Sequence, residues 1–293
     1  MSFLRTILAL SRPSRLPTIW SNCLAGWWLG GGGNAKALPF LLGGATCLFV
    51  GGAFLNDAFD ADFDREHRRF RPIPSGAIGQ KTVWRWGLSL LAAGALLLLW
   101  LNRTTGGLAL ALVFCLVVYN ALHRYVTFSP ILKGVCRFFL YVIGASVATY
   151  GITGWSIWCG IALAIYMTGV GYFARWERLP HQTPYWPAAL LGAPIVLALL
   201  MNTGRYREPA LLLSVALVLW LIRCLRPVFW STERRLDQAI PGLIAGVVFV
   251  DWLATCPVVS IISQSHYAPR PLNFAFLALL FLTLLLQRLV PER

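Results

Sequence analysis

Residues 38–64 decide the fold, and they read LPFLLGGATCLFVGGAFLNDAFDADFD. The first part, residues 38–58, is an almost unbroken apolar run of the length that crosses the hydrocarbon core of a bilayer, about 20 residues. Four carboxylates follow within eight residues, at Asp57, Asp60, Asp62 and Asp64, although the chain of 293 residues holds only 11 acids. The stretch therefore predicts a membrane-spanning helix that ends in a concentrated acidic site.

The rest of the chain has the composition of a membrane protein. Hydrophobic residues make up 58% and charged residues 12%, with a mean hydropathy of +0.67. A soluble domain carries about 25% charged residues. We therefore expect an all-α polytopic membrane protein that forms a single transmembrane domain over residues 1–293. The predicted apolar segments are 16–33, 38–58, 82–101, 106–122, 132–151, 155–173, 186–202, 209–223, 239–260 and 272–289.

The net charge of +14 raises the possibility of a nucleic-acid partner, which the distribution of the charge argues against. If the N-terminus is cytoplasmic, the outer connections hold only five of the 25 basic residues, namely Lys36, Arg103, Arg205, Arg207 and Arg270. This asymmetry follows the positive-inside rule and predicts that both termini are cytoplasmic. The basic residues then reflect topology, and no nucleic-acid partner is expected. Short loops and the lack of a Ser-rich leader favour a prokaryotic plasma membrane.

The acidic segment has a one-sided pattern on a helical wheel. At about 100° per residue, Asn56, Asp57, Asp60 and Asp64 share one arc of about 100°, whereas Asp62 points to the opposite side. Three like charges on one face repel each other unless a proton or a cation neutralises them. Oxygen ligands without His or Cys suit Mg²⁺. We therefore predict that these four residues bind Mg²⁺. The alternative is a solvated helix end whose acids pair with nearby arginines at 65, 68 and 69.

At these residues the chain resembles the UbiA-type intramembrane prenyltransferase superfamily. The pattern N-D-x-x-D-x-x-x-D is met at residues 56–64, and residues 71–76 read RPIPSG, similar to the family's R-P-x-P-S-G loop. Arg12-Pro13, followed by Asn22 and Gly26, is similar to the family's opening helix. The resemblance implies a bundle of nine to ten helices around a central cavity that opens sideways to lipid. It also implies Mg²⁺ and a prenyl diphosphate at the cytoplasmic rim.

The resemblance further implies a reaction and the residues that perform it. Mg²⁺ and basic residues would stabilise the departing diphosphate, so that the allylic C–O bond ionises and an acceptor captures the cation. Asp57, Asp60 and Asp64 are then the predicted catalytic residues. Predicted substrate contacts are Arg15, Asn22, Asn56, Arg71, Tyr119, His123, Lys133, Arg137, Arg175 and Glu177. Arg15, Arg71, Lys133 and Arg137 can equally be ordinary positive-inside residues. Tyr119 and His123 occupy the place of the family's Tyr-x-x-x-Lys pattern, in which His123 or Arg124 replaces the Lys.

The chain departs from the family where a second motif, D-x-x-x-D, is expected. Residues 171–181 contain one carboxylate, Glu177, flanked by Arg175 and Arg178. Glu177 either contributes to a second metal site or orients Arg175, or it forms only an ion pair at a helix end. Together with residues 129–137 (SPILKGVCR), this variation looks closest to the divergent EboC-like branch. Asp251 is expected near the outer face, far from the metal, in a structural hydrogen bond.

Several functions fit this pattern. The leading hypothesis is transfer of a prenyl group to a small or lipidic acceptor. An intramembrane terpene cyclase would ionise the same donor, and a sugar phosphate donor is compatible with the same fold. A non-catalytic carrier of lipids or metabolites that retains the cavity is the alternative from another class. The altered second motif favours the carrier, whereas the intact first motif argues against it. The expected partners are the prenyl diphosphate, an unidentified acceptor and membrane lipids.

Overall fold

The computed structural model describes residues 3–176, 185–202, 204, 207–230, 235–256 and 270–290, and within them the secondary structure is helical throughout. The helices are α1 Phe3–Ser11, η1 Pro13–Arg15, α2 Leu16–Leu29, η2 Ala35–Ala37, α3 Leu38–Phe59, α4 Ala61–His67, α5 Gln80–Leu101, α6 Arg103–Leu122, α7 Ser129–Ser146, α8 Gly154–Trp176, α9 Trp186–Leu191, α10 Ala193–Met201, α11 Arg207–Phe229, α12 Leu236–Ala245, α13 Val247–Thr255 and α15 Arg270–Leu289. Seven helical stretches in these ranges are long and apolar enough to cross a membrane. The predicted fold class, an all-α polytopic membrane protein, is confirmed.

Two of the predicted segments are each formed by two short helices. The segment predicted at 186–202 breaks at Gly192 between α9 and α10, just before Pro194 at the start of α10. Proline lacks an amide hydrogen and its ring crowds the preceding turn, so it interrupts the hydrogen-bond ladder. The segment predicted at 239–260 breaks at Gly246 between α12 and α13. A Cβ at Gly246 would lie 2.5 Å from the Tyr166 hydroxyl, so the backbone at this position packs directly against α8.

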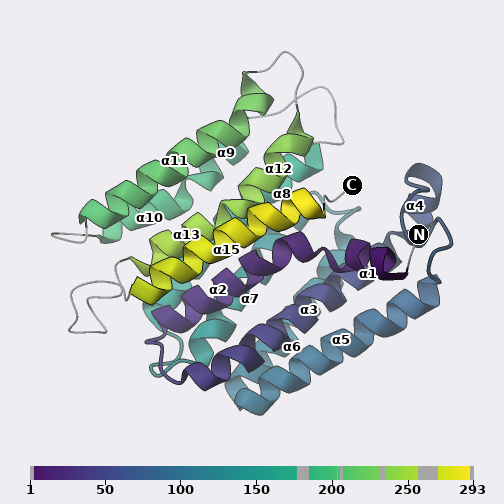
Figure 1. Ribbon diagram of the computed structural model, residues 1–293, viewed down its shortest axis with the longest axis horizontal. Helices are drawn as coiled ribbons and strands as arrows, with labels where there is room; N and C mark the ends of the chain where they lie inside the picture. The colour runs from purple at the N-terminus through teal and green to yellow at the C-terminus, as the bar shows by residue number, and fades with distance from the viewer. Residues whose placement is uncertain are drawn as a thin grey trace.

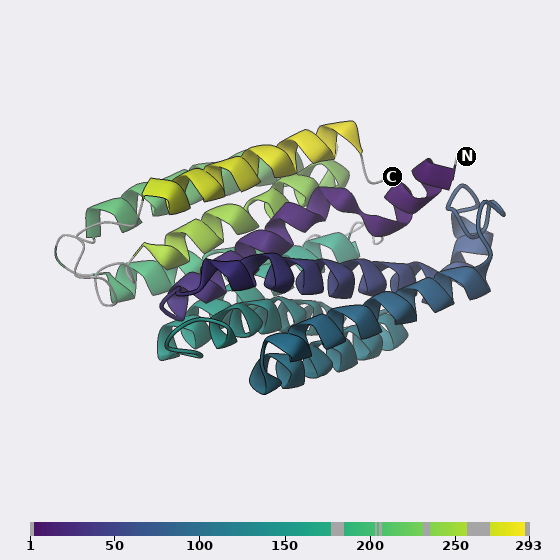
Figure 2. The same cartoon turned by 60° about the horizontal axis from the view of Figure 1, so that its bottom comes forward.

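α2 and α7 run through the middle of the bundle. Figures 1 and 2 show α3, α5 and α6 on one side of this pair, and α8 to α13 with α15 on the other. The two sides have separate apolar cores, and α2 contributes Ile19 and Cys23 to one core and Ala25 and Leu29 to the other. Side chains of α2 therefore contact both halves of the molecule.

Two glycines allow α2 and α7 to cross closely. A Cβ on Gly26 would lie 2.1 Å from the carbonyl oxygen of Tyr141, and a Cβ on Gly144 would lie 2.3 Å from that of Cys23. Neither distance is sterically possible, so only glycine fits at both positions. Small residues allow this kind of close helix packing in membranes, where the lipid gives helices little hydrophobic reason to associate. The crossing brings polar groups of the two helices within hydrogen-bonding distance.

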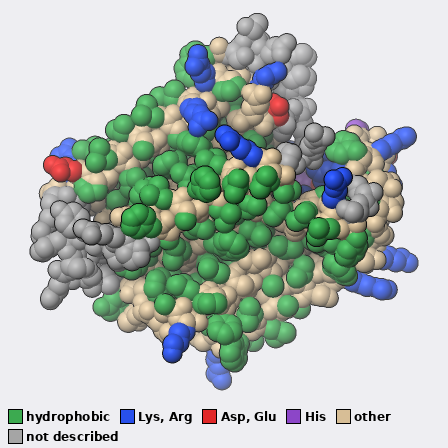
Figure 3. Space-filling view, in the orientation of Figure 1, with side chains coloured by type: hydrophobic (Ala, Val, Ile, Leu, Met, Phe, Trp, Pro, Cys, Tyr) green, Lys and Arg blue, Asp and Glu red, His purple; other side chains and the backbone are tan. Residues whose placement is uncertain are grey.

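The outer surface of the bundle is apolar. Figure 3 shows mostly hydrophobic side chains across the middle of one face. Large side chains such as Phe114 on α6, Leu212 on α11 and Phe281 on α15 are largely exposed. Continuous apolar surface of this kind is stable against lipid but not against water. The chain is an integral membrane protein. α1 begins and α15 ends on the same side of the bundle (Figure 2).

Candidate functional site

The acidic segment forms an inward-facing cluster where α3 meets α4. α3 ends at Phe59, Asp60 keeps near-helical angles (φ −82°, ψ −5°), and α4 begins at the next residue. The helical path is therefore almost continuous, and the one-sided pattern is preserved. Asp57, Asp60 and Asp64 are 6%, 6% and 2% exposed, whereas the side chain of Asp62 is 85% exposed. Three carboxylates thus lie inside the protein and the fourth faces outward.

Arginines from two other parts of the chain hold Asp57. Arg12 donates to the Oδ1 atoms of Asn56 at 2.8 Å and of Asp57 at 2.6 Å. Arg71, from the RPIPSG loop, donates to Asp57 Oδ1 at 3.2 Å and to Asp64 Oδ2 at 3.4 Å. The solvated helix end that was the alternative interpretation is therefore wrong for the buried carboxylates. It holds only for Asp62, which pairs with Arg65.

Asp60 is held by the end of α6 and the turn after it. His123 Nε2 lies 3.3 Å and Arg124 Nη2 lies 2.7 Å from Asp60 Oδ1. Burial raises the pKa of Asp60, but the contact with His123 and the charges of Arg124 and Arg71 outweigh it, so the pKa is lower than the ordinary value. Arg124 also lies over the ring of Phe63, 4.3 Å from its centroid. Asp60 is therefore ionised at neutral pH.

Asp64 differs from Asp60 in the surroundings of its Oδ1 atom: both Oδ1 atoms are buried without a hydrogen bond from the described residues, but only that of Asp60 lies within ion-pair distance of His123 and Arg124. Burial raises the pKa of Asp64; Arg71 opposes this shift, and the neighbouring charge of Asp60 adds to it. Its Oδ1 atom is buried and accepts no hydrogen bond from the described residues. A buried carboxylate oxygen without a partner costs about 1–3 kcal/mol, more if the group is charged. This oxygen therefore provides a place for a cation, a proton or a water molecule.

The donor set suits Mg²⁺ only if other oxygens complete the coordination. Within the described ranges, no three His, Cys, Asp or Glu side chains are close enough together to hold a metal ion by themselves. Mg²⁺ is usually held by one or two carboxylates together with water and phosphate oxygens. Asp64, with its free oxygen, and the adjacent Asp60 and Asp57 fit this mode. The residues present are thus compatible with Mg²⁺ that is bound together with a diphosphate.

A cavity of about 910 Å³, including its open mouth, lies between α2, α3, α6 and α7 beside this cluster. One end is polar and basic, and no carboxylate belongs to its described lining. The remaining wall is apolar. A ligand with an anionic head and a hydrocarbon chain matches this distribution of charge. The polar lining consists of Arg12, Arg15, Asn56, Tyr119, Asn120, Lys133 and Arg137, and the apolar lining includes Ile19, Leu48, Phe49, Leu112, Leu116, Leu140, Met167 and Ile244.

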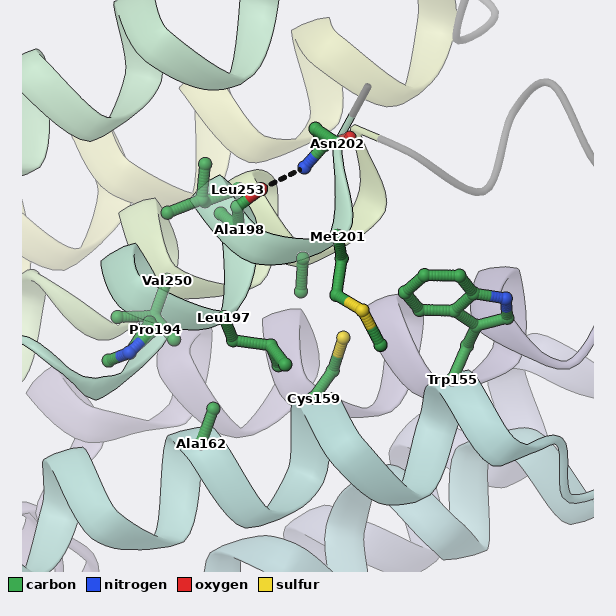
Figure 4. A pocket seen from close by; sticks show the side chains of 11 residues that line it. Trp155, Cys159, Ala162, Pro194, Leu197, Ala198, Met201, Asn202, Val250 and Leu253 are labelled. Atoms are coloured by element: carbon green, nitrogen blue, oxygen red, sulfur yellow. Dashed lines mark hydrogen bonds between the residues drawn. The ribbon is translucent and has the colours of Figure 1, made fainter. Parts of the chain in front are cut away.

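A second, smaller cavity lies between α8, α10 and α13, with a volume of about 330 Å³ (Figure 4). Its lining is apolar apart from Cys159 and Asn202. Asn202 donates a hydrogen bond to the carbonyl of Ala198 in its own helix, at 2.7 Å. No charged side chain belongs to the described lining of this cavity. It therefore lacks the groups that would hold a phosphate.

A profile of the UbiA prenyltransferase family matches residues 16–179, which is more than half of the chain. The chain belongs to this family. The digeranylgeranylglyceryl phosphate synthase of Methanothrix thermoacetophila is 33% identical over 118 residues, which are 40% of this chain and 44% of that one. The protoheme IX farnesyltransferase of Synechococcus elongatus is 29% identical over 207 residues, 67% of this chain and 63% of that one. The UbiA-family protein described here thus spans less than two thirds of either relative.

Solved structures of UbiA homologues have the same fold. The homologue from Aeropyrum pernix K1 is similar with a TM-score of 0.65 and 14% identity, covering 86% of this chain and 98% of that one. The homologue from Archaeoglobus fulgidus bound to DMAPP and Mg²⁺ gives a TM-score of 0.53 and 13% identity, covering 97% and 100%. At such low identity the likeness shows the fold alone. The predicted family and the UbiA-like bundle are confirmed.

The structure of this UbiA-family protein brings together most of the residues that the sequence predicts for the site. Arg15, Asn56, Tyr119, Lys133 and Arg137 line the cavity. Arg71 and His123 contact the carboxylates, and the ring of Tyr119 stacks on that of His123, with centroids 5.4 Å apart. Asn22 lies behind the cavity, where its Oδ1 accepts a hydrogen bond from Arg137 at 2.7 Å. The roles assigned to these residues remain predictions.

Two of the predicted residues are not part of this arrangement. Arg175 donates to the carbonyl of Val126 at 2.7 Å and to the Ser129 hydroxyl at 3.2 Å, so it ties the end of α8 to the segment before α7. It does not belong to the lining of the cavity among the described residues. Glu177 lies outside the residues that the structure describes.

Three contributors were missed as site residues by sequence reasoning, namely Arg12, Asn120 and Arg124. In the sequence, Arg12 stands out only as part of the Arg12-Pro13 pair, and Arg124 only as a replacement for a lysine. Asn120 donates to the carbonyl of Gly52 at 3.1 Å and its Oδ1 lies 3.3 Å from Asn56 Nδ2, so it links α6 to α3. Its spacing from the Tyr119–His123 pair gives no indication of this contact. In the structure, Arg12 is distinguished by its left-handed backbone conformation, which is rare for a residue other than glycine.

Proposed function

We propose that this UbiA-family protein is an intramembrane prenyltransferase that transfers the prenyl group of a prenyl diphosphate to a small or lipidic acceptor. The observation that carries the proposal is the position of the buried Asp57–Asp60–Asp64 cluster beside the basic end of a largely apolar cavity. A diphosphate fits the basic end, and an isoprenoid chain fits the apolar wall.

The protein's own residues account for binding of the diphosphate and for protection of the allylic cation from water. Arg15, Lys133 and Arg137 neutralise the diphosphate, and the gain is large because the site is shielded from water. The apolar wall excludes water from the allylic cation that forms when the C–O bond breaks. Tyr119 presents an aromatic ring near the basic end, where it can stabilise a cation. The bonding electrons leave with the diphosphate, and the acceptor captures the cation and loses a proton.

Mg²⁺ is the proposed cofactor, and Asp57, Asp60 and Asp64 with Asn56 are the residues proposed to hold it. When bound, it would add positive charge beside the leaving diphosphate. The unpartnered Oδ1 of Asp64 supports this assignment. Solved structures of the Archaeoglobus fulgidus homologue contain Mg²⁺ with DMAPP or with GPP, which supports the same donor class. The relatives' names refer to different molecules, a digeranylgeranylglyceryl phosphate and a protoheme, so we propose only the class of acceptor.

We also propose that both termini lie on the cytoplasmic side of a prokaryotic plasma membrane, with the carboxylate cluster at that face. The distribution of Lys and Arg supports this orientation. The single-domain organisation over residues 1–293 and the relation to the EboC-like branch stay predictions.

A carrier that binds the same ligand without reacting is the second candidate. The ion pairs favour the carrier, because arginines already neutralise the carboxylates to which a metal ion would bind. The reduced second motif points the same way, because residues 171–181 hold one carboxylate, Glu177, where the family carries a D-x-x-x-D pair. A carrier would bind the prenyl diphosphate but would release no diphosphate from it.

The deciding experiment combines binding and turnover. Purified protein is mixed with geranylgeranyl diphosphate and increasing Mg²⁺, and affinity and diphosphate release are measured for the wild type, Asp60→Asn and Asp62→Asn. Asp62→Asn is the matched control, because Asp62 is in the same motif but faces outward. We expect Mg²⁺-dependent release that is lost in Asp60→Asn and kept in Asp62→Asn. Binding without release, with any acceptor offered, would favour the carrier. No binding of prenyl diphosphates of any length would overturn the donor assignment.

A further inference from the structure

Asp251 on α13 is a carboxylate buried deep in the bundle, with 0% of its surface exposed. Three side chains donate hydrogen bonds to it. Tyr141 of α7 donates to Oδ1 at 2.5 Å, and Asn22 of α2 donates to Oδ2 at 2.7 Å. The hydroxyl of Ser21 also donates to Oδ2. The predicted structural hydrogen bond of Asp251 is therefore present, but its surroundings connect it to the cavity.

The connection passes through the side-chain amide of Asn22. Its Nδ2 group donates to Asp251, which leaves its Oδ1 atom facing α7. Arg137 donates to that oxygen at 2.7 Å. Because an amide has one donor end and one acceptor end, an acceptor at Asp251 fixes which end meets the guanidinium. Asp251, which accepts from the amide nitrogen, and Arg137, which donates to the amide oxygen, thus select the same orientation of the Asn22 amide.

Arg137 is the residue on which this chain of hydrogen bonds ends. Its guanidinium also donates to the carbonyl and the hydroxyl of Thr18, each at 3.1 Å. It is 7% exposed, and the surface that remains contributes to the basic end of the cavity. Within the described part of the chain, no ion pair joins Arg137 directly to Asp251. Asn22 is therefore the link between the buried carboxylate and the guanidinium.

Packing alone does not account for a carboxylate at this depth. Removing a charged group from water costs several kcal/mol, and an apolar residue of similar size often serves stability equally well. Asp251, Asn22 and Arg137 form a chain that starts in α13, outside the residues matched by the family profile, and ends at the cavity wall. The arrangement gives the C-terminal half of the protein a direct influence on a cavity that is otherwise lined mainly by α2, α3, α6 and α7.

We propose that Asp251 is a positioning residue for donor binding, which orients Asn22 so that Asn22 holds Arg137 at the diphosphate end of the cavity. This inference rests on the proposed function, because it assigns the anionic group of the donor to Arg137. The inference requires that loss of Asp251 weakens donor binding only because Arg137 is no longer held in place.

A double-mutant cycle tests this requirement with geranyl diphosphate as the probe. The dissociation constant is measured for the wild type, Asp251→Leu, Arg137→Lys and the double variant. We expect Asp251→Leu to weaken binding about tenfold, which is the effect of losing about 1.4 kcal/mol of interaction. In the Arg137→Lys background the same substitution should change binding by less than about twofold, since residues that act through one another are not additive.

Tyr141→Phe is the matched control. It removes a hydrogen bond to the other oxygen of the same carboxylate and leaves the link to Asn22 in place. We expect it to lower the Tm while leaving the affinity for geranyl diphosphate within about twofold of wild type. Should Asp251→Leu fail to accumulate, Asn22→Ala breaks the same link from α2 and should show the same loss and the same non-additivity with Arg137→Lys.

The outcomes separate this inference from the proposed function. If the wild type binds geranyl diphosphate but the effects of Asp251→Leu and Arg137→Lys add, Asp251 does not act through Arg137 and the inference is wrong. Equal losses of affinity in Tyr141→Phe and Asp251→Leu would lead to the same conclusion. If the wild type binds no prenyl diphosphate at all, with or without Mg²⁺, the proposed function fails and the inference fails with it.

Discussion

Arg12 adopts a left-handed backbone conformation, with φ of 47° and ψ of 57°, and is the only non-glycine residue with positive φ in the described part of the chain. A side chain costs about 1–2 kcal/mol in this region. Such strain persists where surrounding contacts compensate for it, often at functional sites. Here the turn between α1 and α2 directs the guanidinium to Asn56 and Asp57. The backbone of Arg12 is therefore strained in order to hold the carboxylate cluster.

The strain at Arg12 can be separated from its contacts. Arg12→Ala and Arg12→Gly both remove the guanidinium, but only glycine adopts positive φ without cost. We expect the free energy of unfolding to be about 1 kcal/mol higher for Arg12→Gly than for Arg12→Ala. Affinity for geranyl diphosphate should fall equally in both variants. Equal stability of the two, measured by thermal unfolding in detergent, would show that the backbone is not strained.

The carboxylates Asp60 and Asp64 should respond to pH in opposite ways. The pKa of Asp60 is lowered by folding, so its stabilising effect is complete above the ordinary carboxyl pKa of about 4 and is lost as the pH falls through the lowered value. Asp60→Asn should therefore lower stability by about 1–3 kcal/mol at pH 7, and the difference from wild type should shrink at acid pH.

The pKa of Asp64 is raised, so folding favours its protonated form. The stability that this contributes is present below the ordinary carboxyl pKa and is lost as the pH rises through the raised value. Asp64→Asn should consequently cost less than Asp60→Asn at pH 7. Thermal unfolding of both variants between acid and neutral pH, without added metal, measures the two differences. If Asp64→Asn lost more stability at pH 7 than Asp60→Asn, the two pKa values would not be shifted in opposite directions.

At the scale of the elements, the close crossing of α2 and α7 determines the geometry of the basic end of the cavity. Gly26 and Gly144 remove the side chains that would keep the helices apart, and Asn22 and Arg137 then meet across the contact. The same crossing brings Tyr141 to Asp251. The helix contact and the polar chain are thus coupled, and separating the helices should disturb both.

Gly26→Ala tests this coupling. A Cβ there meets the Tyr141 carbonyl at 2.1 Å, which the backbone can relieve only by moving. Overpacking of this kind typically costs about 1–3 kcal/mol, and affinity for the donor should fall as well. Gly107→Ala in α6 is the control, because nothing lies within 4 Å of the added Cβ and alanine favours a helix. Donor affinity in Gly107→Ala should equal that of the wild type. If Gly26→Ala also left donor affinity unchanged, the crossing would not be coupled to the site.

At the scale of the whole molecule, the orientation in the membrane is open to a direct test. Lys36 lies before α3 and Asp62 lies in α4 after it, and both are exposed. If the termini are cytoplasmic, a membrane-impermeant maleimide added to intact cells should label Lys36→Cys but not Asp62→Cys. The native protein, whose described cysteines are buried or partly buried, provides the background. The reverse pattern would invert the proposed topology.

The sequence by itself determined the class of fold, the family and the inward face of the acidic helix. Apolar runs of membrane-spanning length and a helical period are local properties, so residues 38–64 already place Asp57, Asp60 and Asp64 on one side and Asp62 on the other. The sequence does not predict the break at Gly246, where the backbone packs against α8, whereas Pro194 is a local signal for the break at Gly192.

Only the tertiary structure decided which charges meet. Arg65, Arg68 and Arg69 are nearest to the acids in sequence, yet Arg12, Arg71 and Arg124 hold the buried carboxylates. Asp251 reaches Asn22 across 229 residues, through a crossing that two glycines permit. An ion pair in a low-dielectric interior forms wherever packing brings the groups together, and no local periodicity encodes that distance.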